Sequence, residues 1–489
     1  MYFPLSPSQN QLQMTSSTPA SEQQPAADHF LKPVAFSNRI QSLDVLRGIA
    51  VLAALIVSIW VFGGFSSQQQ NSLLLQSKGW NYRVFGAIEL LFNGKMRALI
   101  ALVFGAAMIL FLTKDREEGR QPAGDVFIKR QLWLIVLGLV NAVLLLWTQD
   151  ILFHLGVMGI LLFPFIRLSH RGLLIAAILT TLIYSGKNYW NYADDKKAYN
   201  KYITLTALEK KFEKDSIDKA QKGITAKKDT LTKLQKQDTS AWTGRLAGMK
   251  VDLKKDEPNK KAMRKVDYGK TWNYLLPATQ SREAQWTYRI GIWDFAGMIF
   301  LGMLLYKIGF FNNRFSRNRY LLLGLIGVTG GLLLGWYRLH FQQIALQDYV
   351  KYINRYVLPH TFFFPLERAV MALAYTSFVM WFLAAGILNG LWKAFAAVGK
   401  LALTNYFIQT IICTIFFYGY GMGYYGRLTQ WQLYLFAAEV IMVQIALSVI
   451  WLKYYNYGPA EWLLRRLSSG KWLSKTIRKP SATEPATPI

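Results

Sequence analysis

The chain has 489 residues, of which 52% are hydrophobic, and its mean hydropathy is +0.17. Apolar runs of membrane length recur from Leu43 to Tyr455, separated by short basic loops, which excludes a soluble globular enzyme. The net charge of +28 would suggest nucleic acid in a soluble protein, but here we attribute it mainly to membrane topology and expect no nucleic-acid partner.

Residues 1–38 are rich in Ser, Gln and Pro and lack an apolar core that ends in a cleavage site. They are predicted to be a disordered tail and not a signal peptide. The stretch from Arg39 to Gly63 holds no charge after Arg47 and is long enough to cross about 30 Å of hydrocarbon as a helix. Asp44 and Arg47 stand three residues apart and therefore share a helical face. They are either an interfacial anchor pair or a pair that holds the cytoplasmic mouth of a cavity between helices.

The remaining apolar runs predict an all-α bundle of about ten membrane spans. The predicted spans are residues 43–62, 96–113, 131–148, 151–165, 172–189, 290–311, 320–339, 361–388, 395–418 and 431–455. Basic residues follow the second, fourth, sixth and tenth spans, so the positive-inside rule puts both termini in the cytoplasm. The first five spans form one membrane region, residues 39–190, and the last five form another, residues 286–456. Residues 457–489 are predicted as a cytoplasmic amphipathic helix that starts at Pro459, followed by a basic tail.

Residues 191–285, between the fifth and sixth spans, have a different composition. They contain more Lys and Arg than Asp and Glu, few aliphatic residues and no run of membrane length. We expect an extracytoplasmic, Lys-rich helical insert that stands outside the membrane. It is either a solvated spacer or a piece that binds an anionic envelope component or a partner.

Polar groups within or beside predicted spans are candidates for function, because their burial in lipid costs several kcal/mol. Asn141 lies in the middle of the third span, and Asp150 and His154 lie four residues apart at the start of the fourth. Asp150 and His154 can share a face as a carboxylate–imidazole pair near the outer surface, with Asp150 orienting His154 as a general base. The alternative is a polar pair that caps the helix start.

Further polar residues lie in the second half of the chain. Asp294 and Glu439 are single carboxylates with apolar neighbours, and each could be the buried partner of Arg47, Arg289 or Arg368. A polar track follows the ninth span at about one-turn spacing: Lys400, Thr404, Asn405 and Gln409. The track either forms hydrogen bonds between helices or lines a cavity.

The residues alone do not specify a reaction. The single cysteine, Cys413, excludes an internal disulfide framework, and no His, Cys or carboxylate cluster has zinc spacing. The chain also has no phosphate-binding P-loop and no GxSxG motif, so we expect no metal site and no bound cofactor.

Several motifs together resemble the YeiB-like family of bacterial inner-membrane proteins, which carries a domain of unknown function 418. The motifs are SLDVLRGIAVLAALIV, GKMRALIALVFGAAMILF, IKRQLWLIVLGLVNAVLLLWTQDILFHLGVMGILLFP, WDFAGMIFLGMLLYKIGFF, VGKLALTNYFIQT and YGPAEWLLRRL. The resemblance implies a multi-pass protein of the bacterial inner membrane. The family's third span usually carries a His where this chain has Asn141.

The N-terminal LDxLRG motif is in turn similar to that of transmembrane acyltransferases, including heparan-α-glucosaminide N-acetyltransferase and sugar O-acyltransferases. That similarity implies transfer of an acyl group from cytoplasmic acyl-CoA to an envelope glycan, lipid or small metabolite. Asp44 and Arg47 would then lie near the donor entrance, with Arg47 and Lys95 or Arg97 for electrostatic work. The alternative function is a transporter or exporter of a small solute, with Asp294, Glu439 and the polar track lining the path.

Overall fold

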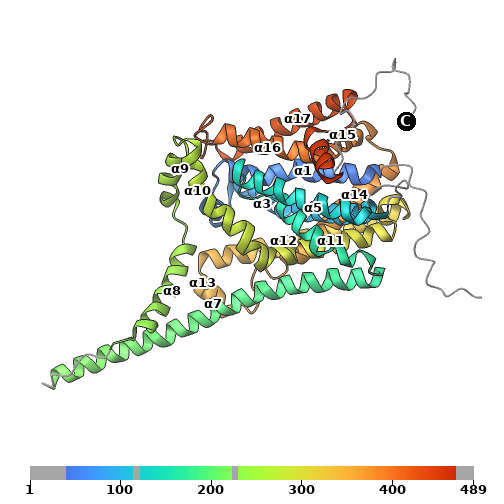
Figure 1. The fold of residues 1–489 in the computed structure, drawn as a ribbon. Helices are drawn as coiled ribbons and strands as arrows, with labels where there is room; N and C mark the ends of the chain where they lie inside the picture. Colours follow the sequence, from blue (N-terminus) through green and yellow to red (C-terminus); the bar gives the residue numbers. More distant parts are fainter. Residues whose placement is uncertain (1–39, 114–121, 223–229, 470–489) are drawn as a thin grey trace, which may run out of the picture. The chain divides into compact units, whose positions relative to one another are not determined.

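The computed structural model describes residues 40–113, 122–222 and 230–469, and every regular element in these ranges is a helix (Figure 1). The predicted all-α fold is confirmed. The α-helices are α1 (Gln41–Phe62), α2 (Ser67–Gln76), α3 (Gly79–Leu91), α4 (Lys95–Thr113), α5 (Ala123–Leu139), α6 (Leu152–Leu161), α7 (His170–Gln221), α8 (Lys233–Met249), α9 (Asp256–Met263), α10 (Tyr268–Gln280), α11 (Ile292–Lys307), α12 (Arg317–Gln347), α13 (Tyr349–Arg355), α14 (Phe364–Ala385), α15 (Asn389–Lys400), α16 (Ala402–Phe417), α17 (Gln430–Tyr454) and α18 (Pro459–Ser469). The predicted N-terminal tail lies outside the described residues.

Two π-helical segments, η2 (Val140–Leu144) and η5 (Ser281–Gly291), join this set, together with three short 3₁₀ turns. The segment η2 continues α5, and η5 connects α10 to α11 without a break. Pro277 lies inside α10, four residues before η5 begins. A proline removes one backbone donor from a helix, and π-helical turns are frequent at functional sites.

Seven stretches of the described helices are long and apolar enough to cross a membrane, and α15 with α16 makes an eighth if the two count as one span bent by 79°. The predicted count of about ten is therefore not confirmed. The predicted fourth span corresponds to α6, which has only 10 residues. The predicted fifth span is the start of α7, where Arg171 and Lys187 enclose an uncharged stretch shorter than a full crossing.

The predicted borders of the insert fall inside continuous helices. The 52 residues of α7 run across the border at residue 190, and a 40-residue helical stretch, Tyr268–Lys307, runs across the border at residue 285. Figure 1 shows α7 as one continuous helix, against which α8 packs. Arg264, just after α9, donates hydrogen bonds to the carbonyls of Tyr425 (2.6 Å) and Gly426 (2.9 Å). The last part of the insert thus contacts the helical bundle directly.

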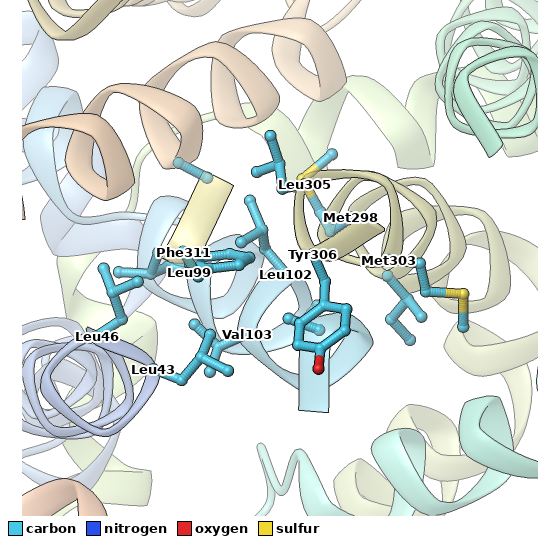
Figure 2. Packing of buried hydrophobic residues seen from close by; sticks show 14 of the residues in the cluster. Leu43, Leu46, Leu99, Leu102, Val103, Met298, Met303, Leu305, Tyr306 and Phe311 are labelled. Atoms are coloured by element: carbon cyan, nitrogen blue, oxygen red, sulfur yellow. The ribbon is translucent and has the colours of Figure 1, made fainter. Parts of the chain in front are cut away.

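Helices α1, α4 and α11 supply much of one hydrophobic core, with Leu43, Leu102 and Met298 among its buried side chains (Figure 2). Close approach of α4 and α11 requires glycine, because a Cβ on Gly302 would overlap the carbonyl oxygen of Leu102. The pairing places the first turns of α4 and α11 side by side. Arg97 and Asp294 lie in those first turns.

A balanced group of four buried charges ties α3, α4, α12 and α14 together. Arg338 Nε lies 2.9 Å from Glu367 Oε2, and its Nη1 lies 3.1 Å from Glu89 Oε2. Lys95 pairs with the other oxygen of Glu367 and donates to the backbone carbonyl of Glu89 at 2.8 Å. Two acids and two bases neutralise one another here, which makes burial of all four tolerable. The group fixes the start of α4 two residues before Arg97.

Candidate functional site

A cavity of about 80 Å³ lies between α1, the start of α4, the loop before α6, η5 and α16. Its wall includes Arg97, Arg282, Gln149, Trp147 and Tyr406. The charged residues among those that line it are the two arginines, and no acid lines it. We call it the two-arginine cavity. Its charge suits an anionic ligand, since a guanidinium binds carboxylates and phosphates through paired hydrogen bonds.

On one side of this cavity, a single carboxylate, that of Asp294, is shared by two arginines. The carboxylate of Asp294 receives Arg97 through Nη2 at 3.0 Å and Nε at 3.1 Å, and its other oxygen pairs with Arg368. A third guanidinium, that of Arg282, lies 3.4 Å from the centre of the Trp286 ring. Buried nitrogen atoms of Arg282 and Arg368 have no hydrogen-bond partner. Of these two residues, Arg282 lines the cavity, so it is the one that can offer an unpaired donor to a ligand there.

Asp150 lies behind the cavity wall, in the loop between η2 and α6, and is fully buried. Its Oδ1 accepts hydrogen bonds from Asn141 Nδ2 at 2.8 Å and from the Tyr406 hydroxyl at 3.1 Å, and its Oδ2 accepts from the Phe153 backbone at 2.9 Å. Burial raises the pKa of Asp150 to about 6, and these three donors partly offset that rise. Since Tyr406 lines the cavity, its hydroxyl connects the cavity to a carboxylate that can take up a proton near neutral pH.

His154 has partners other than Asp150. Its Nε2 lies 2.9 Å from Thr287 Oγ1, and its Nδ1 lies 3.7 Å from Glu283 Oε2. The predicted Asp150–His154 pair is therefore wrong. The Asp150 carboxylate instead accepts a hydrogen bond from the Phe153 backbone at the start of α6, which agrees with the capping alternative. The His154 imidazole lies against η5. Asn141 and Asp150 do come together, and the catalytic role of all three residues stays a prediction.

The polar track on α16 mainly joins helices. Asn405 Nδ2 donates to Ser448 Oγ at 2.9 Å, and Gln409 Nε2 donates to Gln444 Oε1 at 2.9 Å, so both residues connect α16 to α17. Thr404 Oγ1 donates to Glu461 Oε2 of α18 at 2.5 Å. Lys400 is exposed at the end of α15. Of the two interpretations of the track, hydrogen bonding between helices fits this geometry.

The predicted donor-entrance residues do not form one group. Arg47 Nη1 lies 3.2 Å from Asp44 Oδ1 near the start of α1, whereas the cavity touches α1 from Ala54 to Ser58. At 1.5 Å per residue, Arg47 and the cavity are about 10 Å or more apart along α1. Grouping Arg47 with Arg97 is wrong because α1 and α4 run in opposite directions, so their first turns lie at opposite ends.

Glu439 does not line the interior either, since it is exposed on α17. The buried face of α17 follows Leu433, Ala437, Val440 and Gln444 at helical spacing, and Glu439 is rotated away from it by about 100° per residue. The prediction that it lines a cavity or pairs with a buried arginine is wrong. Asp294, its counterpart in that prediction, does meet Arg368.

Sequence reasoning missed the contribution of η5. Arg282, Glu283, Trp286 and Thr287 all belong to it, and all fall within or beside the predicted external insert. The sequence signal for them is weak, because Pro277 and the π-helical turns of η5 interrupt the ordinary helical periodicity between residues 268 and 307. Among the described residues, no group of three or more His, Cys, Asp or Glu side chains could hold a metal ion.

The sequence is similar to those of other proteins over most of its length. The chain is 25% identical to the uncharacterized protein YeiB of Escherichia coli (strain K12), an alignment that covers 89% of this chain and 99% of YeiB. It is 24% identical to the uncharacterized protein YxaH of Bacillus subtilis (strain 168) over 90% of this chain and 97% of YxaH. The profile described as "Protein of unknown function (DUF418)" matches residues 305–471. The chain is thus similar to YeiB and YxaH over most of its length and to the DUF418 profile over residues 305–471.

The DUF418 match includes Tyr406 and the Thr404–Glu461 contact of this YeiB-like protein, whereas Arg97, Asp150 and Arg282 precede it. The two longer alignments reach over most of the chain. No solved structure matches it significantly. The apolar helices and these relatives together identify a bacterial-type membrane protein.

Proposed function

We propose that this YeiB-like protein is an acyltransferase-like membrane protein that transfers an acyl group from acyl-CoA to an anionic acceptor held in the two-arginine cavity. One observation carries the proposal: the wall that presents Arg97 and Arg282 also presents Tyr406, whose hydroxyl donates to the buried Asp150. The arginines would hold the acceptor's negative charge. A carboxylate with a pKa of about 6 suits a general base.

The reaction balances with these groups. A hydroxyl or amine of the acceptor attacks the thioester carbonyl, and the carbon–sulfur bond breaks. The acceptor's proton passes to the Tyr406 oxygen while Tyr406 gives its own proton to Asp150. The CoA thiolate then leaves and takes up this proton, which Asp150 returns through Tyr406. Asn141 orients the carboxylate through its 2.8 Å hydrogen bond. His154 stays a second candidate base, because its ring packs 5.2 Å from that of Trp286, on which Arg282 stacks.

The predicted topology fits a donor that enters from the cytoplasm and an acceptor that binds toward the outside. With both termini in the cytoplasm, the positive-inside rule puts Asp44 and Arg47 at the cytoplasmic end of α1 and the two-arginine cavity toward the outside. The donor would enter beside Arg47, and the acceptor, an envelope glycan, lipid or small metabolite, would bind beside Arg97. The cavity's positive charge favours the anionic members of these classes.

A transporter is the second candidate function, and the bent span of α15 and α16 favours it. Discontinuous helices often form solute sites in transporters, because their free ends bind ions. Here, however, the first turn of α16 already has a ligand. Glu461 Oε1 accepts from the backbone of Leu403 at 2.7 Å and of Thr404 at 3.1 Å. Because Glu461 already occupies the free end of α16, this end is less suited to bind a solute, and we rank the transporter second.

Donor binding is tested by the thermal stability of the purified protein in detergent, with acetyl-CoA titrated against free CoA and ATP. A ligand that binds only the folded state raises the apparent melting temperature in a saturable way. We expect such a shift with acetyl-CoA, and its loss in Arg47→Gln. Arg167→Gln, an exposed arginine of another basic turn, should keep the shift. If millimolar acetyl-CoA has no effect on folded protein, the acyltransferase proposal fails and solute flux into liposomes should be measured.

A further inference from the structure

A second cavity, of about 220 Å³, lies on α7 where this helix leaves its apolar stretch. Its wall includes Tyr189, Tyr192, Lys196 and Lys197 of α7, and Val357 from the loop after α13. It is separate from the two-arginine cavity, with which it shares no lining residue. We call it the α7 cavity.

The residues that precede the α7 cavity form an exposed aliphatic stripe. Large aliphatic side chains are exposed on this part of α7, among them Ile175 (64%), Leu179 (54%) and Leu182 (59%). A water-facing helix would not present such a stripe. Exposed aromatic rings follow at Tyr189 (41%) and Trp190 (68%). Aromatic rings that follow an apolar stripe mark the level of the lipid headgroups.

The cations of the α7 cavity are only weakly neutralised. Asp195 is occupied elsewhere, with Arg245 at 2.6 Å and Tyr349 at 2.7 Å. In the described parts of the chain, no ion pair joins Lys196 to an acid. Lys197 lies 3.8 Å from Asp194, but both side chains are largely exposed, and such pairs contribute little. The cavity therefore offers two ammonium groups to an anion.

The aromatic side of the cavity is already rigid. The Tyr192 hydroxyl donates to the carbonyl of Tyr356 at 2.8 Å, and its ring lies 5.9 Å from that of Tyr352. Tyr192 is 5% exposed. A ligand would therefore meet a fixed wall and order only the lysine side chains, which lowers the entropic cost of binding.

We infer that the α7 cavity binds the phosphate headgroup of an anionic membrane lipid. Lys196 and Lys197 bind the phosphate, the tyrosine rings contact the glycerol part, and the acyl chains lie along the aliphatic stripe of α7. Each lysine near such a surface contributes about 1 kcal/mol. The inference does not depend on the proposed acyl transfer.

The test uses the full-length protein in detergent and short-chain phosphatidylglycerol, with phosphatidylcholine of the same chain length for comparison. We expect phosphatidylglycerol to raise the melting temperature well beyond phosphatidylcholine. The double variant Lys196→Gln/Lys197→Gln should need about thirtyfold more phosphatidylglycerol for half the effect. Lys210→Gln/Lys211→Gln removes the same charge from exposed positions farther along α7 and should behave as wild type.

Three results would overturn the inference. One is an equal response of both double variants, which would mean that general surface charge accounts for the effect. Another is an equal response to the two lipids. The third is a full shift with soluble glycerol phosphate at the same concentration, which would assign the cavity to a free phosphate compound. Lys196→Arg/Lys197→Arg, which keeps both charges, should retain the preference and shows that loss in the Gln variant is not misfolding.

Discussion

Asp150 is a buried carboxylate whose ionisation should affect stability and, in the proposed function, proton transfer. The four-residue spacing predicted a pair of Asp150 and His154, but each of the two side chains has a partner from a more distant element. Tyr406 of α16 donates a hydrogen bond to Asp150, and Thr287 Oγ1 of η5 lies 2.9 Å from His154 Nε2. Spacing along one helix cannot predict such choices, because the packing of other helices decides them.

The raised pKa of Asp150 predicts a specific pH dependence of stability. Its pKa rises from 3.8 when exposed to about 6 in the fold, so the folded state binds the proton more tightly. The stabilisation from this group is complete below pH 4 and disappears as the pH rises through 6, a loss of about 3 kcal/mol. Melting curves of wild type and Asp150→Asn between pH 4 and 7 should therefore differ in slope, with the variant flatter. Parallel curves would contradict the burial of an ionisable group at this position.

At the scale of single elements, the sequence predicts the positions of apolar helices well. It predicts poorly how far a helix continues once its side chains become polar. Predicted spans at residues 43–62, 320–339, 361–388 and 431–455 all correspond to single observed helices. The borders predicted for the insert follow changes in composition, but the helices continue across both borders. Arg282 and its neighbours in η5 therefore fell within or beside the insert and were not predicted as part of the site. The polarity of the side chains indicates whether a helix is surrounded by lipid or water. The length of the helix depends on its backbone hydrogen bonds, which can continue from one environment into the other.

The contact between Glu461 and α16 is an element-scale feature with a measurable effect. Glu461 accepts two backbone N–H groups at the start of α16 and the Thr404 hydroxyl, so it both caps α16 and holds α18. Glu461→Ala should lower stability by about 1–2 kcal/mol, since it leaves helix-end donors unsatisfied. Glu461→Gln should retain part of this stabilisation through its amide oxygen.

Thermal unfolding in detergent provides the comparison, with Glu209→Ala as a control at an exposed acid of α7. The control should leave the melting temperature unchanged. An equally small effect of Glu461→Ala would mean that packing alone holds α18 in place.

At the scale of the whole molecule, the proposed function depends on which way the bundle crosses the membrane. The charge rule puts the far part of α7 outside and the turn at Arg167 inside. Cys413, the single cysteine of the sequence, is buried. Replacing it by serine gives a background for added cysteines. Lys210→Cys should react with an impermeant maleimide in intact cells, and Arg167→Cys only after permeabilisation. The reverse pattern would invert the topology and exclude a cytoplasmic donor at Arg47.

Acyl transfer itself is the reaction that tests the proposed function. Membranes that contain the protein are incubated with acetyl-CoA labelled in the acetyl group, and label is followed into lipid, glycan and small-molecule fractions. We expect transfer by wild type and by Arg289→Gln, an exposed arginine of η5, and loss of transfer in Asp150→Asn and Arg282→Gln. Transfer that persists in both of these variants would place the chemistry elsewhere. Absence of labelled product with folded, acetyl-CoA-binding protein would contradict the proposed activity.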